Sequence, residues 1–508
     1  MIDDRPSSGL MAICLVVAGG VLAAVALVYV VLTSGGNSLS QLAKYVAGVA
    51  FVAGVVNPRA AMFPFIVATI YLDLLKRLLI LYDRVGFMDL FFVLGIGPAL
   101  LAGITGGTLA GIFFGKIRVD KRHWILLAVS VVYVGGMAAM AFRDEGLKDA
   151  LKKVADTAAY SLLLFVIPAL FRDWREIWRL LRFGLIAFLP AGFYAYYQHF
   201  RGLSAFEIEY LKSGLTIMVK ELDDVRPRPF STLNSAHSLA FLSSMLCSIA
   251  FVPLAVGRDH PEISRRRWLF ALLGLFCFGV TFVTMARSGH IVWIAALAAV
   301  LAFSSRRLTI AVYGIGLALY GSLIVFAEWF MVKLPEWDSL LSKDSALMEQ
   351  ATRIQTYTDR LISFTALHDA RNYSLFGVKH YVFTHEALSS MLVNYGLVVL
   401  LPVLIAAGWS LRWIHRELLH LPAGGTRRVV CLFFGVAMGV VTGEIMFGAV
   451  AGVFPINAYV WIMIGGTLVE LFRQADLRRG AENEIDRRHH HPARPVLDGR
   501  GPFATALN

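Results

Sequence analysis

The chain carries little charge for its length. Of its 508 residues, 16% are charged and 57% are hydrophobic, and the mean hydropathy is +0.66. Soluble proteins contain about 25% charged residues, so a soluble globular fold is excluded. Apolar runs of about 18 residues or more recur, and each is long enough to cross a hydrocarbon layer about 30 Å thick as a helix. Because lipid leaves backbone groups no outside partner, the sequence predicts an all-α polytopic membrane helix bundle.

Cysteine is scarce, and an internal repeat and a cleavable leader are lacking. The four cysteines, Cys14, Cys247, Cys277 and Cys431, all fall inside predicted spans. No pair of them has metal-ligand spacing or lies in a loop suited to a disulfide. A metal pair of His380 and His385 is possible, but no acid or third ligand lies at a recognisable spacing, and no metal or other cofactor is expected. The first apolar run lacks a clear cleavage site and is taken as the first span.

Apolar length predicts about fourteen transmembrane helices within residues 1–472, with 12 to 14 compatible with the pattern. The predicted spans are 10–33, 40–57, 60–77, 88–113, 123–142, 156–171, 180–199, 236–256, 268–286, 290–305, 308–329, 386–408, 429–452 and 455–472.

The net charge of +12 is concentrated in loops that all fall on one side of a fourteen-span bundle. These loops contain Lys116 to Arg122, Arg172 to Arg182, Arg258 to Arg267, Arg306 and Arg307, Arg412 to Arg428, and Arg473 to Arg488. The positive-inside rule makes this side cytoplasmic, with both termini on it, in a bacterial inner membrane. The basic residues form no continuous patch, so no nucleic acid is expected as a partner.

Two long segments, about 200–235 and 330–385, fall on the opposite, periplasmic face. The second is a large loop with helical spacing of apolar residues, namely Leu347, Ile354, Tyr357, Leu361 and Phe364. It predicts a helix lying over the mouth of the bundle. Residues 473–508 are polar and predict a disordered cytoplasmic tail.

The first candidate site is RPRPFSTLNSAHSLAFL, which enters the eighth span from the outer face. The guanidinium of Arg228 can donate two hydrogen bonds at once to a phosphate or carboxylate. Asn234 and His237 are polar positions at the top of the helix. The structural alternative is an arginine that extends to the interface, with serine and asparagine capping the helix.

The second candidate is the short turn TMARSGH, whose cation Arg287 lies on the side that the positive-inside rule disfavours. The third is FGVKHYVFTHEALSSMLVNYG, where His385 lies at the re-entry into the membrane and His380 five residues earlier. Imidazole is the usual general base near neutral pH. The alternatives are a tolerated interfacial arginine and interfacial histidines.

Other charged residues have two interpretations. Arg353 and Arg360 are seven residues apart, so on a helix they face one way and suit a diphosphate, or else form a solvated face. Asp73 and Lys76 lie one turn apart within a span and either pair or act in function. Glu444, in the middle of a span, is open to the same two interpretations.

Together, three motifs resemble the O-antigen ligase and Wzy-type polysaccharide polymerase superfamily. RPFSTLNSAHSLA, from Arg228 to Ala240, is similar to that family's Arg-x-Phe-Ser-Thr segment, and TMARSG to its Thr-x-Ser-Arg turn at Arg287. Phe376–Gly396 resembles its Gly-x-Gly, His-Asn, Gly pattern, with His385 and Gly396 eleven residues apart. The chain departs from the family at Ala236, His237, Ala286, Lys379 and Glu386.

The resemblance implies a metal-independent inverting glycosyltransferase of the periplasmic face. The donor would be a glycan on undecaprenyl diphosphate, the acceptor a hydroxyl on a glycan or glycolipid, and other glycan-assembly proteins would be partners. Arg228 and Arg287 would stabilise the leaving diphosphate, and His385 would take the acceptor proton. Arg353, Arg360, His237, Asn234 and His380 would bind substrate.

Length and span number favour a polysaccharide polymerase over a ligase. The competing hypothesis is a membrane transporter or a flippase of lipid-linked glycans. It predicts an internal repeat and ionisable groups at the midplane, and the sequence offers Glu444 but no repeat.

Overall fold

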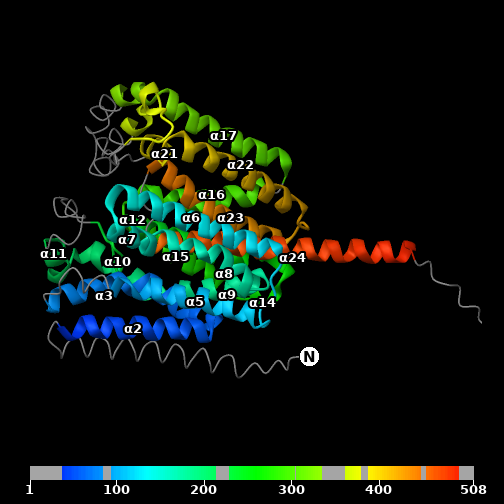
Figure 1. Cartoon of the computed structure of the whole chain (residues 1–508), viewed down its shortest axis with the longest axis horizontal. Helices are drawn as coiled ribbons and strands as arrows, with labels where there is room; N and C mark the ends of the chain where they lie inside the picture. Colours follow the sequence, from blue (N-terminus) through cyan, green and yellow to red (C-terminus); the bar gives the residue numbers. More distant parts are fainter. Residues whose placement is uncertain are drawn as a thin grey trace, which may run out of the picture.

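The computed structural model describes residues 37–83, 93–212, 228–303, 305–333, 361–378, 387–447 and 454–490. Within these ranges every regular element is a helix, so the predicted all-α class is confirmed (Figure 1). The predicted span 10–33 lies outside the described residues.

The helices of the first half are α2 (Asn37–Val56), α3 (Pro58–Asp83), α5 (Ile96–Phe113), α6 (Lys121–Glu145), α7 (Leu147–Asp156), η1 (Ala158–Leu162), α8 (Leu163–Leu170), α9 (Trp174–Ala187), α10 (Leu189–Arg201) and α11 (Ala205–Lys212). The helices of the second half are α12 (Ala236–Ala250), α13 (Val252–Val256), η3 (Gly257–Asp259), α14 (Pro261–Ser264), α15 (Arg267–Val283), η4 (Arg287–Gly289), α16 (His290–Ala302), α17 (Arg306–Val325), η5 (Ala370–Asn372), α21 (Ala387–Tyr395), α22 (Leu397–His420), α23 (Gly425–Phe447) and α24 (Ile456–His490).

Eight helical segments among the described residues are long and apolar enough to cross a membrane. They are Pro58–Leu78, Ile96–Phe113, Lys121–Arg143, Trp174–Arg201, Ala236–Val256, Arg307–Val325, Leu397–His420 and Gly425–Ile445. Four shorter apolar helical segments accompany them. The chain therefore has the helices of a multi-pass membrane protein.

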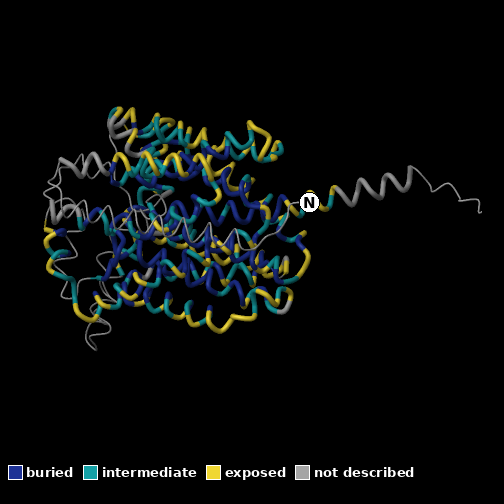
Figure 2. Tube along the Cα trace, turned by 90° about the horizontal axis from the view of Figure 1, so that it is seen from below, coloured by how far each residue is buried: buried dark blue, intermediate teal, exposed yellow. Residues whose placement is uncertain are grey.

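The core of the bundle forms around α12, which contacts α9, α15, α16 and α23. In the segment Ala236–Val256, 83% of the apolar window is buried. Two of the serine hydroxyls within α12 are satisfied locally: Ser243 Oγ donates to Leu239 O at 2.7 Å and Ser248 Oγ to Ser244 O at 3.0 Å. Because these two hydroxyls need no water, both serines can be buried within the bundle. Figure 2 shows buried residues through the middle of the bundle and exposed ones at its periphery.

Two apolar helices, α17 and α22, stand apart from this core. All of residues 401–410 of α22 are exposed, around its whole circumference. Glycines halfway along both helices, Gly314 in α17 and Gly408 in α22, have no neighbouring atom within 4 Å of an added Cβ. α22 is anchored at its C-terminal part, where Ile414 and Leu418 are buried in a cluster with Phe303. Exposed apolar helices of this kind belong in lipid.

Ion pairs and hydrogen bonds connect the basic segments with one another at one end of the bundle. Arg122 pairs with Asp476, Arg175 bonds His260, Arg428 pairs with Asp259, Arg427 donates to Phe303 O, and Arg478 pairs with Glu417. We call this the basic end. The opposite end, which we call the α11 end, holds α11, α21 and the start of α12 (Figure 1), and η4 contacts α12.

Two predicted boundaries are corrected. The predicted disordered tail, 473–508, begins too early, because α24 continues as a helix to His490. Residues that favour helix and the partners of Asp476 and Arg478 extend the helix past the apolar part. The predicted span 386–408 is broken at Gly396, which separates α21 from α22.

The described part of the large predicted loop, residues 361–378, starts with a short helical turn. Two residues of the predicted apolar stripe, Leu361 and Phe364, are buried there against Ala327 and the C-terminal part of α17. The predicted helix over the mouth of the bundle stays a prediction, since residues 334–360 lie outside the described residues.

Candidate functional site

The residues Arg228 to Ser235 form a tight turn that leads into α12, called here the 228–235 turn. Its central residues, from Phe230 to Leu233, are buried. Ser231 adopts φ of +52°, a left-handed conformation that is uncommon without glycine. Ser235 caps α12, since its Oγ accepts from Ser238 N at 3.0 Å, which agrees with the structural alternative for this serine.

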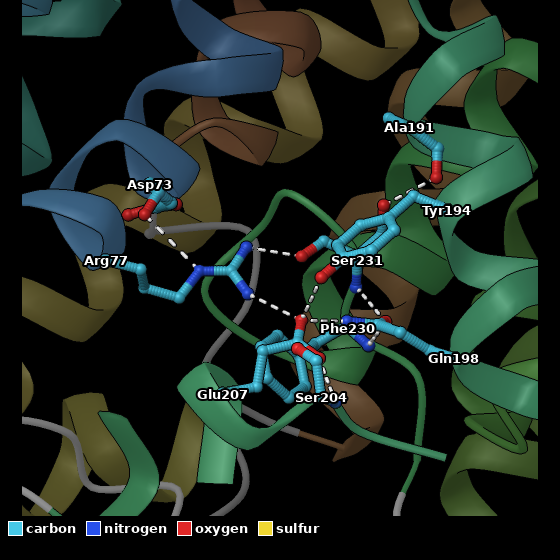
Figure 3. Close-up of polar contacts among 9 residues, drawn as sticks. All are labelled: Asp73, Arg77, Ala191, Tyr194, Gln198, Ser204, Glu207, Phe230 and Ser231. Atoms are coloured by element: carbon cyan, nitrogen blue, oxygen red, sulfur yellow. Dashed lines mark hydrogen bonds and ion pairs between the residues drawn. The ribbon is translucent and has the colours of Figure 1, made fainter. Parts of the chain in front are cut away.

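Polar side chains from two other helices hold the 228–235 turn (Figure 3). Gln198 Oε1 of α10 accepts from Phe230 N at 3.1 Å and from Ser231 N at 2.6 Å. Ser231 Oγ donates to Ala191 O at 2.5 Å. Arg77 Nη2 of α3 donates to Ser231 O. Both backbone polar groups of Ser231 and its hydroxyl therefore have partners in the bundle.

The centre of this network is a buried ion pair. Arg77 Nη1 lies 3.5 Å from Glu207 Oε1, and the two side chains are 1% and 0% exposed. The same carboxylate accepts from Tyr194 OH at 2.9 Å, from Gln198 Nε2, and from both Ser204 N and Ser204 Oγ at 2.9 and 2.8 Å. A buried charge is tolerated only when it is paired and hydrogen-bonded in this way.

A second cation, Lys76, precedes Arg77 in α3 and makes longer polar contacts. Lys76 Nζ is 3.7 Å from Asp73 Oδ1 and donates to Asn234 Oδ1 at 3.4 Å. It also lies 5.8 Å from the centre of the Tyr210 ring. The pairing interpretation of Asp73 and Lys76 is thus confirmed, and Lys76 in addition contacts the predicted site residue Asn234.

The second motif packs directly on α12. Met285 has φ of +53°, and Thr284 Oγ1 accepts from Ala286 N at 3.3 Å. A Cβ added to Gly289 would lie 3.0 Å from Ala240 O, so the backbone of η4 touches the second turn of α12. Ser231 and Met285 are the two described residues other than glycine with positive φ. Strained backbone of this kind tends to cluster at functional sites.

The third motif contains a close contact between two glycines. Gly377 and Gly396 both have φ of +72°, and a Cβ on Gly396 would lie 2.5 Å from Gly377 N. Leu397 N and Val398 N donate to Ser374 O and Leu375 O at 3.0 and 3.1 Å. These contacts join the two flanks of residues 379–386, which lie outside the described residues.

The predicted site residues divide into three groups. Arg228 and His237 are half-buried, at the start of the 228–235 turn and in the first turn of α12, and Asn234 bonds Lys76. The backbone of Arg287 lies in η4. Arg353, Arg360, His380 and His385 lie outside the described residues and stay predictions. The structure thus brings the first two motifs together on α12.

Sequence reasoning missed Arg77, Gln198 and Glu207. A signal was available for Arg77, since it is a cation at the outer end of the predicted span 60–77, the side that the positive-inside rule disfavours. For Gln198 and Glu207 there was no comparable signal, because their partners are distant in sequence.

Glu444, on α23, follows Gly443, whose added Cβ would meet the Phe241 ring at 2.8 Å. It is half-buried, and its role stays open between packing and function. Among the described residues, no three histidine, cysteine, aspartate or glutamate side chains group as a metal site would require. Comparisons with protein-family models, with curated proteins and with solved structures find no match to the chain.

Proposed function

We propose that the chain is a bacterial inner-membrane glycosyltransferase of the O-antigen ligase and polymerase type. It transfers a glycan from undecaprenyl diphosphate to a hydroxyl of an acceptor glycan or glycolipid. The observation that carries the proposal is that η4 packs on the first turns of α12, the helix into which the 228–235 turn leads. Two arginine-bearing motifs, separated by more than fifty residues, thereby belong to one region at the α11 end.

The proposed topology has fourteen spans, with the basic end cytoplasmic and the α11 end periplasmic. Both termini are then cytoplasmic, and the large loop 330–385 is periplasmic. The ion pairs among the basic segments support this orientation, because positively charged loops are retained in the cytoplasm. α24 leaves the bundle at the basic end (Figure 1).

In the proposed reaction the acceptor oxygen attacks the anomeric carbon of the donor sugar as the bond from that carbon to the diphosphate oxygen breaks. Attack from the opposite side inverts the configuration. Arg228 and Arg287, with Arg353 and Arg360, stabilise the charge that grows on the leaving diphosphate. His385 takes the proton of the acceptor hydroxyl. Asn234, His237 and His380 bind the sugars and phosphates, and the polyprenyl chain stays in lipid.

Reconstitution with a lipid-diphosphate oligosaccharide and an acceptor tests the proposal. Arg228→Ala and Arg287→Ala should each abolish transfer while the proteins insert and unfold as the wild type does. Arg371→Ala is the matched control, since its side chain is 91% exposed and pairs only with nearby Asp369 among the interactions described. Unchanged product from either of the first two variants refutes the assignment.

The same vesicles separate an enzyme from a flippase. A transferase lengthens or attaches the glycan, and a polymerase is expected to give a ladder of lengths, whereas a ligase gives a single addition. Movement of the lipid-linked glycan across the bilayer without a new glycosidic bond would identify a flippase and overturn the proposal.

A further inference from the structure

Glu207 receives an unusual number of donors for a residue of a short helix. Its two oxygens accept from Arg77, Gln198, Tyr194 and Ser204, which contributes both its N–H and its hydroxyl. Replacing a buried ion pair by apolar side chains is often neutral or stabilising, so stability alone does not account for such a pair. Buried polar groups in some proteins fix one geometry among several.

The carboxylate of Glu207 determines which way the Gln198 amide points. An ionised carboxylate only accepts hydrogen bonds, so the NH₂ of Gln198 must face it. The amide oxygen then faces the opposite way and accepts from Phe230 N and Ser231 N. If the amide were turned over, its NH₂ would face these two backbone donors.

Arg77 provides a second connection from Glu207 to the same residue. Its guanidinium pairs with Glu207 through Nη1 and donates through Nη2 to Ser231 O. The guanidinium carbon also lies 4.7 Å from the centre of the Phe230 ring. The N–H and the C=O of Ser231 are thus both oriented by side chains that Glu207 binds (Figure 3).

The chain between Ser231 and Arg228 has little freedom to absorb a change. Ser231 is held at φ of +52°, and the Phe230 side chain is buried. Pro229 has a fixed φ, and it restricts the backbone of the residue before it, Arg228, to extended conformations. The orientation set at Ser231 is therefore transmitted over three residues to the backbone of Arg228, from which its side chain extends.

We propose that Glu207 is a positioning residue for Arg228, acting through Arg77 and Gln198 without touching the substrate. The proposal rests on the proposed function, because it assigns Glu207 to the site where the lipid diphosphate is held. It predicts that Glu207→Gln lowers the rate of glycan transfer more than it lowers the amount of folded protein.

The experiment compares Glu207→Gln with Glu470→Gln in the full-length reconstituted protein. Glu470 is a matched control at the basic end: it too is 0% exposed, and it accepts from Arg473 and Gln474. Initial rates are measured against the concentrations of donor and acceptor. A displacement of about 1 Å at a reacting group costs about 100-fold in rate. Glu207→Gln should lower kcat/KM for the donor by about this factor, with a higher donor KM and an unchanged acceptor KM.

Glu470→Gln should at most lower the amount of folded enzyme, which reduces the maximal rate and leaves both KM values unchanged. If Glu207→Gln behaves in the same way, the positioning role is refuted. Arg77→Lys decides the matter if Glu207→Gln does not fold. The lysine keeps the positive charge, but its single ammonium group cannot bond Glu207 and Ser231 O at the same time. It should also raise the donor KM, and wild-type kinetics from it would overturn the inference.

The results also separate the inference from the proposed function. Normal glycan transfer by Arg228→Ala would refute the proposed function. An inactive Arg228→Ala together with Glu207→Gln kinetics that match those of Glu470→Gln would leave the function standing and remove only the positioning role.

Discussion

Replacing Gly396 by alanine should destabilise the protein and disturb the flanks of the His385 segment. Gly396 has φ of +72° and ψ of −173°, a region that is essentially restricted to glycine, and an alanine there costs about 1–3 kcal/mol. The new Cβ would lie 2.4 Å from Leu375 O and 2.5 Å from Gly377 N, which are backbone atoms that cannot turn away. The segment from Ser374 must therefore move, and its two hydrogen bonds to Leu397 and Val398 are worth about 1 kcal/mol each.

The expected loss in the free energy of unfolding is thus about 3–5 kcal/mol. It can be measured by thermal unfolding of the protein in lipid nanodiscs, followed by tryptophan fluorescence. Gly408→Ala is the matched control, because Gly408 lies within α22 and has no atom within 4 Å of an added Cβ. Alanine there favours the helix by about 0.5–1 kcal/mol. An unfolding temperature of Gly396→Ala at or above that of the wild type would refute the contact between the two flanks.

Three further substitutions test other parts of the fold. Gly289→Val should separate η4 from α12 and abolish glycan transfer in the reconstituted assay, and normal transfer would speak against that packing. Leu418→Ala should cost about 2–5 kcal/mol in unfolding measurements because Leu418 is 0% exposed, whereas Leu404→Ala, on the exposed part of α22, should cost little. Asp120→Ala removes the N-cap of α6 and should cost about 1 kcal/mol. Partial burial raises the pKa of Asp120, but its hydrogen bonds with His123 and the charges of His123 and Arg122 together outweigh this and lower the pKa overall. The stabilisation by Asp120 is therefore present above the ordinary aspartate pKa and lost as the pH falls through the lower folded-state value, which unfolding curves between pH 3 and pH 7 would check.

The membrane helices were predictable because their signal is local. A stretch such as Ala236–Val256 is apolar along its whole length, and no tertiary contact is needed to recognise it. The end of α24 was not predictable in the same way. Apolar length stops at Phe472, but the helix continues on polar residues whose side chains bond other segments, as Asp476 does with Arg122.

The candidate site was predictable in part for the same reason. The pairing of Asp73 with Lys76 follows from helical spacing, and the capping by Ser235 follows from its place before α12. The pairing of Arg77 with Glu207 joins residues 130 positions apart, on helices whose contact is decided only when the bundle assembles. Neither the spacing nor the composition of the sequence contains this information.

The separation of α17 and α22 from the core has a consequence for how the protein should be handled. Where a helix is exposed around its whole circumference, acyl chains fill the space that side chains fill elsewhere. The apolar length of these helices must then match the thickness of the surrounding bilayer, since a mismatch is relieved by tilting or by local thinning or thickening of the lipid. Extraction into a detergent of short chain length removes that lipid, so purification should retain native lipid around these two helices.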